Sequence, residues 1–209
     1  MTRIVGIGGK LASGKDAISD YLVETYGWVK MGMSDPLADA LYTLDPLIET
    51  RDETQVRVRF LGFIPLWRKT VVTTGVIRYQ AVFDRLGYVK AKEIPEVRRL
   101  LQILGTEVGR KQLSDGNLWT DIMERKVRQA VESGAPGVIV TGIRFPNETS
   151  AIETNLEGEL WWVERPSLKS TVNAGHASEN SVNRRDFHVE ILNDGTLPDL
   201  YDKVDRLVN

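Results

Sequence analysis

A group of glycines and one lysine near the start of the chain has the spacing of a phosphate-binding loop. In the stretch GIGGKLASGKDAISDYL, residues 6–22, Gly9 is followed five residues later by Gly14 and then by Lys15. Glycines allow several backbone N–H groups to point into one anion site, the next helix adds its positive N-terminal end, and the lysine adds a full charge. The loop follows an apolar segment at 3–7 and opens a helical pattern, so we predict phosphate binding rather than a plain glycine-rich turn.

The residue after this lysine departs from the usual pattern. A Ser or Thr normally stands there and ligates the Mg²⁺ carried by a nucleoside triphosphate, whereas this chain has Asp16. A carboxylate could hold Mg²⁺ directly or through water, because hard cations prefer oxygen ligands. In the competing interpretation, Asp16 only caps the following helix by accepting backbone N–H bonds.

Cationic side chains occur in this loop and at several other places where loops or helix starts are expected. Phosphoryl transfer depends mainly on positioning and charge neutralisation, so such a site needs cations from several segments. The candidates are Lys10, Lys15, Arg98, Arg99, Arg144 and Arg165. Arg98 and Arg99 could instead form a solvated helix face, and Arg144 could pair with Glu148 four residues later.

Alternating strand and helix patterns position these residues. Short apolar runs predict strands at 3–7, 28–33, 137–143, 159–166 and 187–192. Helical spacing follows the loop, continues from a cap at Ser34 or Asp35, and recurs at 95–110, 117–131 and 193–208. This order predicts the α/β class, with right-handed βαβ units and a mainly parallel sheet. For residues 46–92 we expect an irregular or helical insertion.

Composition limits the classes of protein to which the chain can belong. Its 209 residues, 42% of them hydrophobic, can bury one sizeable core, so we expect a single domain. A net charge of -2 gives no overall basic face, which argues against polymeric nucleic acid as a partner. The absence of Cys excludes disulfides, Cys-zinc sites and thiol catalysis. No apolar run approaches the length of a membrane span, so we expect a cytoplasmic protein without a membrane partner.

Seven short blocks, taken in order, resemble the bacteriophage deoxynucleoside monophosphate kinases. The first is the Gly-Lys-Asp that ends the loop, and the others are SDPLADAL, VRRLLQILGTEVGR, IRFPNE, VERP, HASE and ILNDGTL. They recur in the family's order over nearly the whole length of the chain, and only residues 46–92 show no match. The resemblance implies a P-loop kinase fold of 1–209, with an acceptor-binding arm at 46–92 and a lid at 165–187.

The resemblance also implies substrates and site residues. The expected reaction transfers the γ-phosphoryl group of ATP, carried with Mg²⁺, to a deoxynucleoside 5'-monophosphate, in host cytoplasm if the chain is phage-encoded. Catalytic roles fall on Lys15, Asp16 and Arg144, with Asp16 as the metal ligand. The implied ATP-binding residues are Gly9, Lys10, Ser13, Gly14, Lys15, Asp16, Ala17, Arg165 and Asn193. The implied acceptor-binding residues are Lys10, Leu37, Arg98, Arg99, Gln102, Trp119, Arg144 and Glu148.

Aromatic and histidine side chains receive fewer roles. Trp119 matches an aromatic residue of the family's acceptor region and could stack on a nucleobase, although core packing is an equal alternative. Adjacent strand residues face opposite sides, so Trp161 and Trp162 should both be packed between sheet and helices. His176 falls in the expected lid, and His188 is expected to be structural.

One departure leaves the assignment open to other interpretations. The family usually has Asp two residues before the Arg of RFPNE, but this chain has Gly142. Either Asp16 and Glu148 cover the metal and acceptor contacts, or acceptor recognition differs. Two alternatives therefore remain: a kinase for another small acceptor, similar to phosphomevalonate or dephospho-coenzyme A kinases, and a nucleotide-binding regulator without turnover. The base, the sugar and the oligomeric state, including a homodimer, are undecided by the sequence.

Overall fold

The computed structural model describes residues 2–60, 64–109, 111, 113, 116–167 and 181–209, with only the backbone described at 51–60 and 64–73. These residues divide into two compact units. The first, here called the sheet unit, comprises Met1–Pro36 and Leu113–Asn209, and the second, the inserted unit, comprises Leu37–Gln112. Residues 168–180 of the predicted lid, His176 among them, lie outside the described residues.

The sheet unit is built on five parallel strands. They are β1 (Arg3–Gly9), β2 (Val29–Gly32), β5 (Gly137–Thr141), β6 (Glu159–Glu164) and β7 (Val189–Leu192). Their order is β2-β5-β1-β6-β7, and all four neighbouring pairs run parallel. The predicted α/β class and mainly parallel sheet are confirmed. Because β1 is the central strand, the loop that follows it lies at the middle of the sheet's C-terminal edge.

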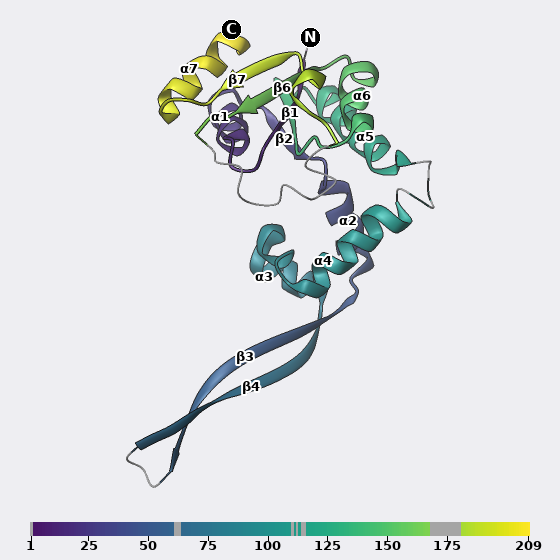
Figure 1. Ribbon diagram of the computed structural model, residues 1–209. Helices are drawn as coiled ribbons and strands as arrows, with labels where there is room; N and C mark the ends of the chain where they lie inside the picture. Colours follow the sequence, from purple (N-terminus) through teal and green to yellow (C-terminus); the bar gives the residue numbers. More distant parts are fainter. Residues whose placement is uncertain (1, 61–63, 110, 112, 114–115, 168–180) are drawn as a thin grey trace. The chain divides into compact units, whose positions relative to one another are not determined.

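Helices cover both faces of this sheet (Figure 1). One face carries α1 (Lys15–Tyr26) and α7 (Leu197–Val208), and the other carries α5 (Leu118–Glu132), α6 (Pro146–Ser150) and the π-helical turn η3 (Ala151–Asn155). Trp161 packs with residues of α1 and α7, whereas its neighbour Trp162 packs with residues of α5 and η3. Both are buried, as predicted from the alternation of side chains along a strand.

The inserted unit begins within α2 (Asp35–Leu44) and contains a two-stranded antiparallel sheet. Its strands are β3 (Leu47–Phe60) and β4 (Ile64–Arg78), paired from Leu47 with Arg78 to Phe60 with Ile64. Three helical segments follow: α3 (Tyr79–Ala91), α4 (Pro95–Gln102) and the π-helical η1 (Ile103–Val108). A buried cluster that includes Leu41, Ile48, Val82 and Val97 joins these elements.

The expectation for residues 46–92 was wrong over most of its length. Residues 47–60 and 64–78 form strands, and helix begins only at Tyr79. The segment VRVRF, residues 56–60, already has the period-two alternation of a strand. Charged residues, Pro65 and Gly75 obscured this signal, and the cross-strand pairing that satisfies these backbones has no local signature.

None of the helices in the described part of the chain combines the length and apolar character of a bilayer-spanning segment.

Candidate active site at the phosphate-binding loop

The loop between β1 and α1 has the backbone that its glycines predict. Gly9, Ala12 and Gly14 have positive φ angles of 135°, 60° and 110°. A Cβ added to Gly9 would lie 2.4 Å from the carbonyl oxygen of Val163, and one on Gly14 would lie 2.6 Å from Nδ2 of Asn193. These two positions therefore need glycine both for their dihedral angles and for space.

The N-terminus of α1 is open toward this loop. Gly14 is the N-cap residue, and no side chain caps the helix. The first N–H groups of a helix have no partner within it, and the helix dipole makes this end positive. Ser13, within the loop, is buried, with 1% of its surface exposed. The result is a glycine-lined backbone cradle that is suited to an anion.

Lys15 lies folded over the loop. Its Nζ donates to the carbonyl oxygens of Gly9 at 2.7 Å and Lys10 at 2.6 Å, and to Oγ of Ser13 at 3.4 Å. The ammonium group is thus held at the cradle by main-chain oxygens. Phosphate oxygens entering the cradle would meet a positive charge already in place.

Asp16 does not act as a helix cap in this structure. Its carboxylate is highly exposed, at 89% of the side-chain surface, and its Oδ1 lies 3.9 Å from Nζ of Lys30. Lys30 pairs more closely with Asp20, at 2.8 Å. A solvent-facing carboxylate in the first turn of α1 is compatible with a metal ligand, and the capping interpretation has no hydrogen bond to support it.

Three further residues of the predicted site follow the C-terminal end of β5: Gly142, Arg144 and Glu148. Gly142 has a φ angle of 81°, and a Cβ there would have no heavy atom within 4 Å. The Glu148 carboxylate accepts from the backbone N–H groups of Arg144, at 2.7 Å, and Phe145, at 3.2 Å. The Glu148 side chain therefore binds the main chain of Arg144 and stabilises the start of α6. The side chain of Arg144 is exposed.

The β6 and β7 side of the loop supplies contacts that sequence reasoning missed. Asn193 donates from Nδ2 to the carbonyl oxygen of Ser13 at 2.8 Å, and its backbone N–H donates to the carbonyl oxygen of Glu164 at 2.7 Å. Glu164 accepts from Nε1 of Trp162 at 2.9 Å, and its other carboxylate oxygen lies 4.0 Å from Nζ of Lys10. Arg165, the next residue, is exposed.

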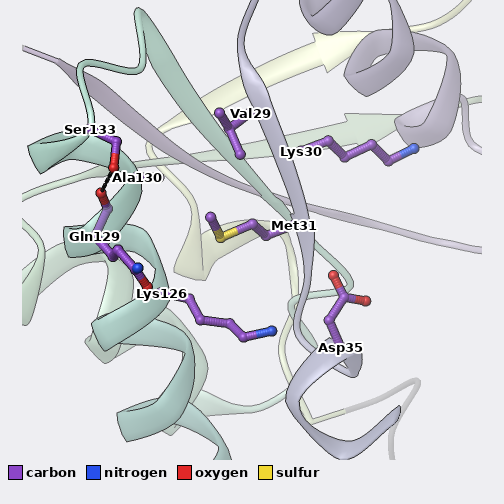
Figure 2. Close-up of a pocket in the computed structure, with 8 residues that line it drawn as sticks. All are labelled: Val29, Lys30, Met31, Asp35, Lys126, Gln129, Ala130 and Ser133. Atoms are coloured by element: carbon purple, nitrogen blue, oxygen red, sulfur yellow. Dashed lines mark hydrogen bonds between the residues drawn. The ribbon is translucent and has the colours of Figure 1, made fainter. Parts of the chain in front are cut away.

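A second feature of the sheet unit is a groove of about 460 Å³ that runs along the outer strand β2, between it and α5 (Figure 2). Met31 and Lys30 point to opposite sides of β2, and Asp35 stands near the end of the strand (Figure 2). Oδ2 of Asp35 accepts from the N–H of Gly32 at 2.6 Å. A Cβ on Gly32 would lie 2.7 Å from the other oxygen, so the glycine makes room for this carboxylate. Sequence reasoning treated Asp35 only as a helix cap.

The inserted unit contains the remaining acceptor candidates. Arg99 makes two hydrogen bonds to Glu96, at 2.7 and 2.6 Å, and lines a groove of about 1540 Å³ together with Arg85 and Lys90. Hydrogen bonding from Arg99 lowers the pKa of the Glu96 carboxyl. Arg98 and Gln102 are exposed, and Leu37 packs against the buried cluster of the unit.

Three further predictions concern the sheet unit. His188 accepts at Nδ1 from the N–H of Leu160 at 3.1 Å and contacts Glu153 through Nε2 at 2.9 Å, which confirms a structural role. Trp119 is buried, with 9% of its surface exposed, and stacking on a base stays a prediction. Ala17 is partly buried against the core that contains Trp161. Among the described residues, no group of three or more His, Asp or Glu side chains could form a metal site.

Comparisons with known proteins agree with the resemblance in the sequence. The pattern of the family described as deoxynucleotide monophosphate kinase matches residues 67–204. The deoxynucleotide monophosphate kinase of Enterobacteria phage T4 is 25% identical over 237 aligned positions, which cover 97% of both chains. That of Escherichia phage RB69 is 22% identical over 246 positions, with 99% of each chain covered. The deoxynucleoside-5'-monophosphate kinase of Escherichia phage T5 is 34% identical over 101 residues, which cover 46% of this chain and 38% of that relative.

The matched segment includes β5, β6, the Asn193 loop and most of the inserted unit. Residues upstream of it supply the anion cradle and Lys15, and the phage T4 relative covers these as well. Since the family pattern matches well over half of its residues, the chain belongs to the deoxynucleotide monophosphate kinase family.

Proposed function

We propose that this kinase transfers the γ-phosphoryl group of ATP to a deoxynucleoside 5'-monophosphate. An oxygen of the acceptor phosphate attacks the γ-phosphorus, the bond from that phosphorus to the β,γ-bridging oxygen breaks, and ADP leaves. The observation that carries the proposal is the glycine cradle at the open N-terminus of α1, with the Lys15 ammonium held at its rim. Backbone N–H groups and Lys15 would neutralise charge on the phosphates as the group is transferred.

Mg²⁺ fits this site as an ion brought by the triphosphate. The described residues offer no cluster of three acidic or histidine ligands, but Asp16 places one exposed carboxylate beside the cradle. Asp16 would hold the ion directly or through water, as hard cations prefer oxygen ligands. When bound, Mg²⁺ supplies charge neutralisation on the phosphate oxygens. Glu148 is less suited, because its carboxylate already accepts two backbone N–H groups.

The acceptor would be bound by cations beyond the loop. Arg144 follows a strand at the C-terminal edge of the sheet, where open α/β sheets place their ligands. Arg98 and Arg99 lie within α4 in the inserted unit, and a guanidinium can hold two phosphate oxygens at once. The partners proposed are small nucleotides, without polymeric nucleic acid or a membrane. Family membership favours a nucleotide acceptor over the other small acceptors that related loops serve.

A coupled assay of ADP release tests the proposal. The protein is supplied with ATP, Mg²⁺ and one acceptor from a panel of deoxynucleoside and ribonucleoside monophosphates, phosphomevalonate and dephospho-coenzyme A. We expect turnover with at least one deoxynucleoside monophosphate. Turnover only with a non-nucleotide acceptor would contradict the proposal, and ATP binding without turnover on any acceptor would indicate a regulator.

Replacing the arginine that contacts the acceptor should affect one substrate selectively. Loss of a charge-assisted hydrogen bond to the phosphate predicts a KM for the monophosphate about 10- to 100-fold higher in Arg99→Ala or Arg98→Ala, with the KM for ATP little changed. Steady-state kinetics with each substrate varied in turn measures both. Equal effects on the two KM values would contradict an acceptor contact and favour the alternative that these arginines form a solvated helix face.

Glu96 distinguishes the two arginines. If Arg99 is the contact, the Glu96 carboxylate competes with the phosphate for the guanidinium, because two of its N–H donors already bind Glu96. Glu96→Gln removes the competing charge, so it should lower the KM for the monophosphate. An unchanged KM would point to Arg98 instead. Arg128→Ala, an exposed arginine of α5, is the control and should match the parent.

Asp16 variants test the metal contact. Asp16→Asn keeps the size of the side chain but loses the charge that attracts a hard cation, so half-maximal rate should require about tenfold more Mg²⁺ or higher. ATP binding without metal should be unchanged or tighter, because a negative charge near the triphosphate has gone. Asp16→Ser restores the usual residue type and should recover more activity than Asp16→Ala. A Mg²⁺ titration of the rate measures the midpoint in each variant.

A capping role predicts a different outcome for the same variants. Loss of a cap would cost Asp16→Ala about 1 kcal/mol of unfolding free energy and so lower its melting temperature, without moving the Mg²⁺ midpoint. Asp20→Asn is the matched control, since Asp20 shares Lys30 with Asp16 but lies one turn further along α1. An unmoved midpoint in every Asp16 variant would exclude the metal role.

A further inference from the structure

Asn193 connects the loop after β7 to the phosphate cradle. Its Nδ2 donates to the main-chain carbonyl of Ser13 at 2.8 Å, and its own N–H donates to the carbonyl of Glu164 at 2.7 Å. Ser13 is almost fully buried, and Asn193 is half-buried. The family resemblance implied that Asn193 binds ATP, but the contact seen here is with the protein's own loop.

The Asn193 contact determines which way one peptide group of the cradle points. In a trans peptide the C=O and N–H bonds point in opposite directions. No cis peptide bond occurs in the described chain. The Ser13 carbonyl points at Asn193, so the N–H of Gly14 in the same peptide must point away from Asn193. Among the described residues no group accepts a hydrogen bond from that N–H, which leaves it available to an anion.

The packing around this peptide restricts alternative arrangements. Gly14 has a φ angle of 110°, and a Cβ there would lie 2.6 Å from Nδ2 of Asn193, so the amide lies directly against the glycine. Gly14 can adopt many backbone conformations, and a flip of the Ser13–Gly14 peptide would need only local rotation. The hydrogen bond from Asn193 opposes that flip.

The loop that carries Asn193 is itself fixed to α7. Nζ of Lys203 donates to the carbonyl oxygen of Leu192 at 2.6 Å and to Oδ1 of Asp194 at 2.7 Å. Thr196 and Asp199 form a reciprocal capping box at the start of α7. The residues on both sides of Asn193 are therefore held by the last helix, and the amide is presented from a supported segment.

We propose that Asn193 is a positioning residue for the triphosphate: through the Ser13 carbonyl it orients the Gly14 N–H toward the phosphates, without needing to contact the nucleoside. This inference rests on the proposed donor site. Asn193 therefore strengthens binding of the phosphate chain of ATP and does not contribute to binding of the base or sugar.

Two partial ligands distinguish a role of Asn193 in phosphate binding from a direct contact with the nucleoside. Inorganic tripolyphosphate carries only the phosphate chain of the donor, and adenosine carries only its base and sugar. We expect Asn193→Ala to weaken tripolyphosphate binding about tenfold, the scale of one lost hydrogen bond, and to leave adenosine binding unchanged. Titration calorimetry on the full chain measures both, and thermal melting checks the fold. Asn193→Asp, which keeps the side-chain shape but has no donor, should weaken tripolyphosphate at least as much.

A matched control and the opposite outcomes complete the experiment. Asn155 donates from Nδ2 to Glu124 at 2.6 Å on the α5 side of the sheet, so Asn155→Ala also deletes an amide hydrogen bond but should bind tripolyphosphate like the parent. Loss of adenosine binding with tripolyphosphate intact would show a direct nucleoside contact and overturn the inference. So would unchanged binding of both ligands, or a parallel loss of both. If the parent binds no tripolyphosphate, the donor site itself is wrong, and this inference fails with it.

Discussion

Lys15→Ala should reduce turnover by about 10²- to 10³-fold or more and leave the fold intact. Removal of a group that stabilises charge on a reacting centre typically costs this much in rate. In the structure the ammonium is held over the cradle by the carbonyls of Gly9 and Lys10, outside both buried clusters of the sheet unit. The rate of ADP formation at saturating ATP and acceptor measures the effect.

The melting temperature shows whether the loss is chemical. Two hydrogen bonds to main-chain carbonyls disappear with Lys15, each with a net value of about 1 kcal/mol, so a small decrease is expected. Lys111→Ala removes an exposed lysine that pairs with Glu107, and it should retain parental activity. Normal turnover by a folded Lys15→Ala protein would exclude the loop from the reaction.

Trp161→Ala should be the most destabilising single truncation in the sheet unit, at about 3–5 kcal/mol of unfolding free energy. Trp161 is fully buried between β6 and the helices α1 and α7, and its Nε1 donates to Glu159 at 3.1 Å. Truncation leaves a large cavity and breaks this hydrogen bond. Denaturant unfolding followed by circular dichroism measures the loss.

Conservative and exposed replacements provide the comparison for Trp161. Trp161→Phe keeps an aromatic ring in the same layer and should lose clearly less stability than Trp161→Ala. Tyr201→Ala, a partly buried aromatic of α7 that stacks on Tyr21, should cost less again. A loss below about 1 kcal/mol for Trp161→Ala would mean that the core can collapse around the missing ring.

Much of the sheet unit could be predicted because its signals are local. Short stretches of sequence predict these elements without information from the rest of the chain. Examples are the apolar run GVIVT, which is followed by Gly142, and the apolar residues at helical spacing after Lys15. The cradle was equally accessible, since Gly9 and Gly14 are required by the dihedral angles of the same short loop. The hairpin of the inserted unit was not predicted, because its stability depends on pairing between strands that no single window contains.

The contacts of the site were harder to predict than its residues. Glu148 accepts a hydrogen bond from the backbone N–H of Arg144, and a four-residue spacing in the sequence does not reveal such a main-chain contact. The hydrogen bond from Asn193 to Ser13 joins residues 180 positions apart. Its acceptor is a main-chain carbonyl, which every residue has, so the residue type at position 13 does not predict the contact. Asp35 was predicted as a helix cap, but its carboxylate binds the N–H of Gly32. The only local indication of this contact is that residue 32 is a glycine, which leaves room for the carboxylate.

The strand order also bears on synthesis at the ribosome. β1 is made first, yet its neighbours in the sheet are β5 and β6, and Arg3 pairs with Gly137. Every residue of the inserted unit emerges before that partner exists, and because the unit is contiguous in the chain, its own strands and helices are complete by then. Closing the central sheet requires long-range pairing, which is slow. The nascent chain therefore carries an unpaired apolar β1 for most of its synthesis, and exposure to chaperones or aggregation should be greatest in that interval.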